Sequence, residues 1–200
     1  MSVPTTEPGL RERKKAATRL SLYEAAFRLA LEHGPDRITV EAIADEAGVS
    51  RRTFSNYFAN KEEALFYGDR LRMRQMADMV RARPPDEPAW AALSAAAAEF
   101  YGERGDLDPE WTARTRLIRR HPSLAAAQMQ SFAAMEREIA AEVSGRLGRS
   151  DPRGVRARLI SATFLVTLRV SLTVWLEHPA DTTFWDLAGE SLAEAGRGFA

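Results

Sequence analysis

Residues 39–65 read TVEAIADEAGVSRRTFSNYFANKEEAL and contain the pattern of two short helices joined by a tight turn. Thr39 is a good N-cap, because its hydroxyl can accept a hydrogen bond from the first turn of a helix. The apolar side chains that follow it recur on one helical face, at Val40, Ile43, Ala44 and Ala47. Gly48-Val49-Ser50 then ends the first helix after about two turns, since glycine adopts the backbone conformation that a tight turn requires.

Ser50 is the N-cap expected for the second helix, whose apolar back is formed by Phe54 and Phe58. Two short helices joined by Gly-Val-Ser, with Val49 filling the angle between them, are typical of a helix-turn-helix. The outward positions carry side chains that can donate to a base edge or a phosphate, namely Arg51, Arg52, Thr53, Ser55 and Asn56. The pattern favours DNA binding. An ordinary helical hairpin inside a bundle has similar caps and spacing and remains the alternative.

A basic run precedes this motif. The whole chain has 28 Lys+Arg and 28 Asp+Glu and therefore no net charge, but residues 11–19 hold five basic side chains and one acidic side chain. Before a helix-turn-helix, such a run is expected to be an arm that contacts phosphates. A solvated helix face is the other interpretation.

Elsewhere, apolar residues recur at spacings of three and four and no strand alternation persists, so the sequence predicts an all-α protein of about nine helices. We expect a flexible tail at residues 1–9, a three-helix DNA-binding domain at 10–67 and a helical ligand-binding and dimerisation domain at 68–200. Asn60 and Glu63 resemble a capping box, so a fourth helix should begin at Lys61. The remaining helices are expected near residues 10–32, 61–83, 88–104, 109–120, 123–147, 153–177 and 183–199.

The composition also excludes several kinds of chemistry. The chain has no cysteine, which excludes disulfides and thiolate metal sites, and its three histidines all lie at predicted helix ends. We therefore expect no metal, no cofactor and no enzymatic activity. The apolar stretch 159–176 is interrupted by Arg169 and several hydroxyl side chains, so it predicts a buried or dimer-facing helix and no membrane partner. With no secretory signal pattern at the start, the expected location is the cytoplasm.

Residues 39–65 and the helix before them resemble the N-terminal domain of the TetR family of bacterial transcriptional regulators. The shared pattern is a threonine-led helix, Ala-Gly-Val-Ser, an aromatic-rich recognition helix, Tyr-Phe, Lys-Glu and a leucine, and it covers about residues 11–67. The resemblance implies an all-helical fold in which the N-terminal domain binds DNA.

The resemblance also implies roles for individual residues. Thr39, Tyr57 and Lys61 correspond to positions that contact phosphates, and the positions that approach bases are Arg52, Thr53, Ser55 and Asn56. From the residues themselves, Tyr57 could equally be a core side chain, Lys61 a solvated lysine and Asn56 simply exposed. Relatives often place larger aromatic or basic residues at positions 55 and 56, so base specificity does not transfer.

The remainder of the chain resembles the effector-binding and dimerisation domain of the same family in general plan. Its last two long helices correspond by order to the pair that usually forms a dimeric four-helix bundle, and we expect interface residues at Phe164, Leu168, Leu172 and Trp175. The side chains expected to line an effector pocket are Trp90, Leu93, Phe100, Trp111, Leu117, Met129, Phe132 and Arg169. Each apolar one could instead be plain core, and Arg169 could form an interface ion pair or face solvent.

The function expected from these features is sequence-specific regulation of transcription. The leading hypothesis is a ligand-responsive repressor that binds a palindromic double-stranded operator as a homodimer and responds to a small-molecule effector of unknown identity. An activator would have the same sequence signature. A helical small-molecule-binding protein without specific DNA binding is the remaining alternative.

Overall fold

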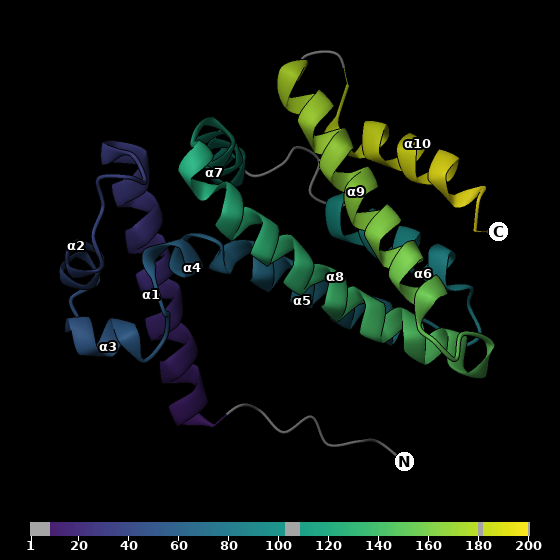
Figure 1. The fold of residues 1–200 in the computed structure, drawn as a ribbon, viewed down its shortest axis with the longest axis horizontal. Helices are drawn as coiled ribbons and strands as arrows, with labels where there is room; N and C mark the ends of the chain where they lie inside the picture. Colours follow the sequence, from purple (N-terminus) through teal and green to yellow (C-terminus); the bar gives the residue numbers. More distant parts are fainter. Residues whose placement is uncertain (1–8, 103–108, 180–181, 200) are drawn as a thin grey trace. The chain divides into compact units, whose positions relative to one another are not determined.

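The computed structural model describes residues 9–102, 109–179 and 182–199, and these form ten α-helices (Figure 1). The all-α prediction is confirmed. Residues 1–8 of the expected tail and residues 103–104 of an expected helix lie outside the described part of the chain. The helices in chain order are α1 (Leu10–His33), α2 (Val40–Glu46), α3 (Arg51–Ser55), α4 (Lys61–Leu65), α5 (Tyr67–Ala82), α6 (Ala89–Ala97), α7 (Pro109–Arg120), α8 (Ala125–Leu147), α9 (Val155–Glu177) and α10 (Phe184–Gly196).

The described residues divide into two compact units. The N-terminal unit contains the residues up to Gly68 together with His121–Ala127, and the C-terminal unit contains the described parts of 69–120 and 128–199. We expected a boundary between residues 67 and 68. The sequence did not indicate that His121–Ala127, which follows α7 and includes the first residues of α8, packs with the N-terminal unit.

In the N-terminal unit, α1 supplies a row of buried side chains against which the short helices pack. The buried residues of α2, α3 and α4 complete this core, and the set includes Leu22, Ala25, Ala26, Phe27, Ala30, Ile43, Ala44, Phe54, Phe58, Ala64 and Leu65. Helices as short as α2, α3 and α4 are not stable in isolation, because so few intrahelical hydrogen bonds do not offset the entropy of ordering. Their packing on α1 therefore holds them in place.

The helix expected at residues 61–83 is interrupted after one turn, which is one reason why ten helices are found where about nine were expected. Helix α4 ends at Leu65, Phe66 has φ −88° and ψ 2°, and α5 begins at Tyr67. Residues 64–68 are all buried. Five consecutive residues of a regular helix point to all sides of it, so the change of direction lets this segment bury them together.

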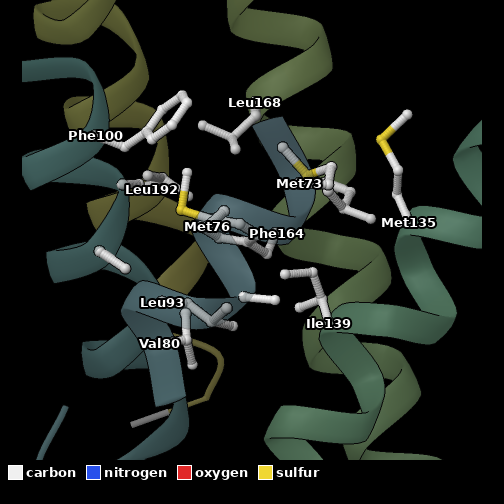
Figure 2. Close-up of a cluster of buried hydrophobic side chains, with 14 of the residues drawn as sticks. Met73, Met76, Val80, Leu93, Phe100, Met135, Ile139, Phe164, Leu168 and Leu192 are labelled. Carbon is white, nitrogen blue, oxygen red and sulfur yellow. The ribbon is translucent and has the colours of Figure 1, made fainter. Parts of the chain in front are cut away.

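The C-terminal unit is built around one apolar cluster to which α5, α6, α8, α9 and α10 contribute (Figure 2). Met76, Leu93 and Ile139 are fully buried in this cluster. At its edge, Trp90 of α6 donates from its Nε1 to the Leu192 carbonyl oxygen over 3.2 Å and stacks on Phe199. This packing joins α6 to α10.

Arg146 of α8 ties the end of α5 to the same unit. Its guanidinium donates to the carbonyl oxygens of Arg83 over 3.1 Å and Pro84 over 2.6 Å, and also to that of Val80. These carbonyls belong to the last turn of α5 and the loop after it, where the regular hydrogen bonds of the helix end. Arg146 therefore caps α5 from a helix more than 60 residues away in sequence.

Helix α9 is long and apolar enough to cross a membrane by length and composition, with a mean hydropathy of 1.8 in its most apolar window. The core helix of a soluble protein meets the same criteria. Here α9 buries Ile160, Phe164 and Leu168 in the apolar cluster of the C-terminal unit. The stretch that the sequence marked as a buried or dimer-facing helix is therefore packed along one side.

Candidate nucleic-acid interface

The turn between α2 and α3 is fixed by local hydrogen bonds. Thr39 Oγ1 accepts from the Ala42 amide over 3.1 Å, and Ser50 Oγ accepts from the Thr53 amide over 3.0 Å, so both predicted N-caps are confirmed. Gly48 has φ +66°, a conformation that side-chain-bearing residues rarely adopt. The Val49 amide donates to the Ala44 carbonyl oxygen over 2.9 Å and closes the turn.

Helix α3 buries Phe54 and leaves its polar residues outward. Arg51, Arg52 and Ser55 are exposed, as is Asn56, which directly follows the helix. Thr53 is half-buried, and its hydroxyl lies 2.9 Å from Ser50 Oγ within the cap. One face of this short helix thus presents three polar side chains, at positions 52, 55 and 56, that form no ion pair or side-chain hydrogen bond with the described part of the chain.

Arg51 is the exception on this face. Its guanidinium forms an ion pair with Glu41 of α2, with an N···O distance of 2.9 Å, and both side chains are largely exposed. A carboxylate next to the recognition helix repels phosphate and competes for the arginine. Sequence reasoning missed Glu41, although its place in the first turn of α2 was visible.

Tyr57 lies half-buried two residues after the end of α3, with Arg19 of α1 beside it. The Arg19 Nη2 donates to the Tyr57 carbonyl oxygen over 3.2 Å, and the guanidinium lies 5.8 Å from the centre of the tyrosine ring. Tyr57 is therefore neither a fully buried core side chain nor a freely exposed one.

Lys61 has partners that the sequence did not suggest. Its Nζ donates to the carbonyl oxygens of Pro35 over 2.9 Å and Ile38 over 3.0 Å, with that of Asp36 at 3.5 Å. The ammonium thus binds the loop between α1 and α2. This geometry differs from the solvated lysine that the sequence left open, and the phosphate contact that the resemblance implies stays a prediction.

The same loop is held from a second side by the segment after α7. Asp36 Oδ2 lies 3.5 Å from His121 Nδ1, and a hydrogen bond with Ser123 is the main cause that lowers the pKa of Asp36 below its ordinary value. Gly34 has φ +83°, and a Cβ added there would lie 3.8 Å from His121. The loop that precedes Thr39 is therefore fixed by contacts with both α4 and the segment His121–Ala127.

The basic run is part of a helix. Arg11, Arg13, Lys14 and Lys15 are exposed in the first turns of α1, whereas Arg19 is half-buried in the contacts described above. These four exposed side chains provide positive charge on the N-terminal unit. Arg19 has a different environment from the rest of the run.

The residues expected in an effector pocket are distributed between core and surface of the C-terminal unit. Leu93, Phe100 and Trp111 are buried, and three more are half-buried, namely Trp90, Leu117 and Phe132. Met129 is 68% exposed and Arg169 is also exposed, with its guanidinium 6.0 Å from the Phe132 ring centre. The structure therefore brings Leu93, Phe100 and Trp111 into one cluster and leaves Met129 and Arg169 outside it.

The residues expected at the dimer interface mostly face inward. Phe164, Leu168 and Trp175 are buried in the C-terminal unit and Leu172 is half-buried. The opposite side of α9 carries the exposed large apolar side chains, which are Val155, Leu159, Val166, Val170 and Val174. The spacing of apolar residues shows that α9 has more of them than one buried side needs. It does not show which side of the helix the rest of the unit covers.

Two family models match this sequence. The model described as "Bacterial regulatory proteins, tetR family" matches residues 22–66, and the model described as "MftR C-terminal domain" matches residues 87–200. The HTH-type transcriptional regulator TcmR of Streptomyces glaucescens is 32% identical over 197 residues, which cover 95% of this chain and 87% of that protein.

Solved structures agree with this picture at the level of the fold. SmeT, described as the repressor of the Stenotrophomonas maltophilia efflux pump SmeDEF, is similar in its triclosan complex with a TM-score of 0.61 and 18% identity, covering 91% of both chains. FadR of Bacillus subtilis in complex with stearoyl-CoA has a TM-score of 0.56 and 19% identity, covering 88% of this chain and 96% of that one.

Proposed function

This chain belongs to the TetR family of bacterial regulatory proteins, and we propose that it is a ligand-responsive repressor that binds a palindromic operator as a homodimer. The family consists of DNA-binding transcriptional regulators and not of enzymes, and similar proteins such as SmeT are repressors. Because its target would be the bacterial chromosome, we place the protein in the cytoplasm.

The observation that carries the DNA-binding part of the proposal is the exposed polar face of α3. Arg52, Ser55 and Asn56 lie outward, while Phe54 anchors the helix in the core of the N-terminal unit. An arginine can read guanine through two hydrogen bonds and an asparagine can read adenine in the same way. We propose that these three side chains contact bases and that Thr39 and Tyr57 contact flanking phosphates.

Homodimerisation is supported by the exposed stripe of α9. Its five members, Val155, Leu159, Val166, Val170 and Val174, are each between 41% and 56% exposed. At 3.6 residues per turn they lie within about 100° of one another, so they share one side of the helix. A second copy of the chain is the proposed partner, because a two-fold axis lets the same stripe cover itself. The interface we expected at Phe164, Leu168, Leu172 and Trp175 moves to this side of α9.

Effector binding in the C-terminal unit is supported by buried polar atoms. Trp111 Nε1, Thr112 Oγ1 and Ser131 Oγ are inaccessible to solvent and have no hydrogen-bond partner within the described protein. Leaving such groups unpaired is costly, and a bound molecule with hydrogen-bond acceptors would relieve that cost. Related structures hold triclosan and stearoyl-CoA, which each combine an apolar part with oxygen acceptors. We propose an effector of this general chemistry.

Regulation then requires only that the effector bind one conformation of the protein more tightly than another. If the effector binds better to a conformation in which the two recognition helices are wrongly spaced for DNA, it lowers operator affinity, and DNA lowers effector affinity to the same extent. We propose α5 as the connection, because it follows the N-terminal unit directly and contributes Met73, Met76 and Val80 to the C-terminal cluster.

The test is a selection from random-sequence duplex DNA with the purified protein, followed by sequencing of the retained DNA. The wild type should enrich a two-fold symmetric site whose half-sites are about one helical turn, roughly 34–36 Å, apart. Arg52→Ala should lose or change the preferred base in each half-site. Arg137→Ala removes an exposed arginine from α8 of the C-terminal unit and should enrich the same site as the wild type. If the wild type enriches no site, the proposed function is wrong.

A further inference from the structure

Arg19 occupies an aromatic environment within the N-terminal unit. The carbon at the centre of its guanidinium lies 5.8 Å from the ring centre of Tyr57, 5.7 Å from that of Phe58 and 5.6 Å from that of Tyr67. All three distances are within the range of a cation–π interaction. The same side chain donates from Nη2 to the Tyr57 carbonyl oxygen over 3.2 Å.

The partners of Arg19 come from functionally different parts of the chain. Tyr57 and Phe58 are the second and third residues after the recognition helix α3, and Tyr67 is the first residue of α5. Tyr67 also makes edge contacts with Phe58, at 5.5 Å between ring centres, and with Tyr23 of α1, at 6.2 Å. One side chain of α1 therefore connects the end of the recognition helix with the start of the helix that leads out of the unit.

Only an arginine provides all of these contacts at once. Its flat guanidinium can lie against aromatic rings while a nitrogen at its edge donates to a carbonyl, whereas a lysine ammonium is a compact and strongly hydrated charge. The Arg19 Nε is inaccessible to solvent. Arg19 is half-buried, whereas Lys14 and Lys15 of the same helix are exposed.

We propose that Arg19 is a positioning residue for DNA recognition: it fixes the orientation of Tyr57 and the C-terminal end of α3 relative to α1, and it does not itself neutralise a phosphate. This inference rests on the proposed DNA-binding function. It separates Arg19 from the basic run of residues 11–19, in which the sequence alone treats all five basic side chains alike.

The salt dependence of DNA binding distinguishes a positioning role from a phosphate contact. Each phosphate that a side chain neutralises contributes about −0.9 to the slope of log K against log salt concentration for duplex DNA. Operator and random duplex DNA would be titrated at several salt concentrations with wild type, Arg19→Met and Lys15→Met. Lys15→Met is the matched control, because it removes one positive charge from the same helix at an exposed position.

For Arg19→Met we expect operator affinity to fall at least about tenfold with an unchanged salt slope, since no phosphate contact is lost. The ratio of operator to random-DNA affinity should fall with it. For Lys15→Met the slope should become shallower by about 0.9, with affinity for both DNAs reduced alike. If Arg19→Met makes the slope shallower by about 0.9, or leaves operator affinity unchanged, the proposal is wrong.

Arg19→Lys keeps the positive charge and provides a second test in case Arg19→Met does not fold. Helix content and melting temperature from circular dichroism would be compared for both Arg19 variants. A folded Arg19→Lys protein with reduced operator preference and an unchanged slope supports the proposal, because lysine retains charge but not the flat stacking geometry. Full wild-type affinity of Arg19→Lys would contradict it. If the wild type itself binds no operator, the proposed function is wrong.

Discussion

At the scale of single residues, one carboxylate competes for an arginine of the proposed DNA interface. Glu41 holds Arg51 in an ion pair at 2.9 Å, so this arginine is restrained when DNA is absent. Exposed ion pairs contribute little to folding stability. The pair therefore affects recognition more than the fold, and its removal should be visible in DNA binding.

We expect Glu41→Gln to raise operator affinity by about fivefold, which corresponds to the roughly 1 kcal/mol that an exposed ion pair can contribute. Glu46→Gln is the control, because Glu46 lies on the same helix and pairs with Arg28 of α1 at 3.0 Å, away from α3. Fluorescence anisotropy with labelled operator measures both. Equal effects of the two variants would mean that only the overall charge matters.

Lys61 gives a second prediction at this scale. Its ammonium donates to carbonyl oxygens of the loop at residues 35–38, so Lys61→Met should lower the free energy of unfolding by about 2 kcal/mol, through the loss of charged hydrogen bonds. Urea denaturation measures this change. The exposed Lys15→Met should change stability by less than about 0.5 kcal/mol. If Lys61→Met leaves stability unchanged but makes the salt dependence of DNA binding shallower, Lys61 contacts a phosphate, as the family resemblance implies, and does not stabilise the loop.

At the scale of helices, close packing requires glycine at one position of α10. A Cβ added at Gly196 would lie 2.3 Å from Trp90 Nε1, closer than non-bonded atoms approach, whereas a Cβ at Gly189 would lie 3.6 Å from Trp185. We therefore expect Gly196→Ala to lower the free energy of unfolding by about 1–3 kcal/mol through overpacking. Gly189→Ala should leave it unchanged or raise it by up to about 1 kcal/mol, because alanine favours helix. Thermal denaturation followed by tryptophan fluorescence compares the two.

The hydrogen bonds of Asp151 at the start of α9 predict that the stability of the fold depends on pH. Asp151 Oδ2 accepts from the Ala157 amide over 2.8 Å, and hydrogen bonds from backbone amides, led by that of Ala157, lower the pKa of Asp151 below its ordinary value of 3.8. A carboxyl whose pKa is lower in the folded state stabilises the fold above pH 3.8, and this contribution disappears as the pH falls through the folded-state value. Asp151→Asn should therefore melt at a lower temperature than the wild type at pH 7, with the difference shrinking below about pH 4. A difference independent of pH would contradict this explanation.

At the scale of the whole molecule, the proposed dimer determines whether two recognition helices can bind one operator. Val170 belongs to the exposed stripe of α9 and is 48% exposed. Burying a charge there without a partner is unfavourable, so Val170→Asp should weaken dimerisation at least about tenfold and reduce operator affinity with it. Met129→Asp, at a 68% exposed position of α8, should do neither. Sedimentation equilibrium measures the association. If Val170→Asp dimerises as strongly as the wild type, the dimer interface does not include this stripe.

The residues whose positions sequence reasoning predicted have partners only a few residues away. Thr39, Ser50 and Asn60 each accept a hydrogen bond from the amide three residues further on, and this spacing is readable in the sequence. The break at Phe66 was not predicted. It coincides with five consecutive buried residues, 64–68, and helical periodicity does not report burial on all sides of a helix.

The sequence by itself determined the all-α fold, the helix-turn-helix and the outward polar face of α3, because caps, turns and helical periodicity act within a few residues. Only the tertiary structure decided that Lys61 binds a loop, that Arg19 lies among three aromatic rings, and which stripe of α9 stays exposed. Long side chains reach partners tens of residues away, and an apolar helix with two apolar stripes buries whichever one its neighbours cover. Those choices depend on how distant helices pack, which spacing along the chain does not encode.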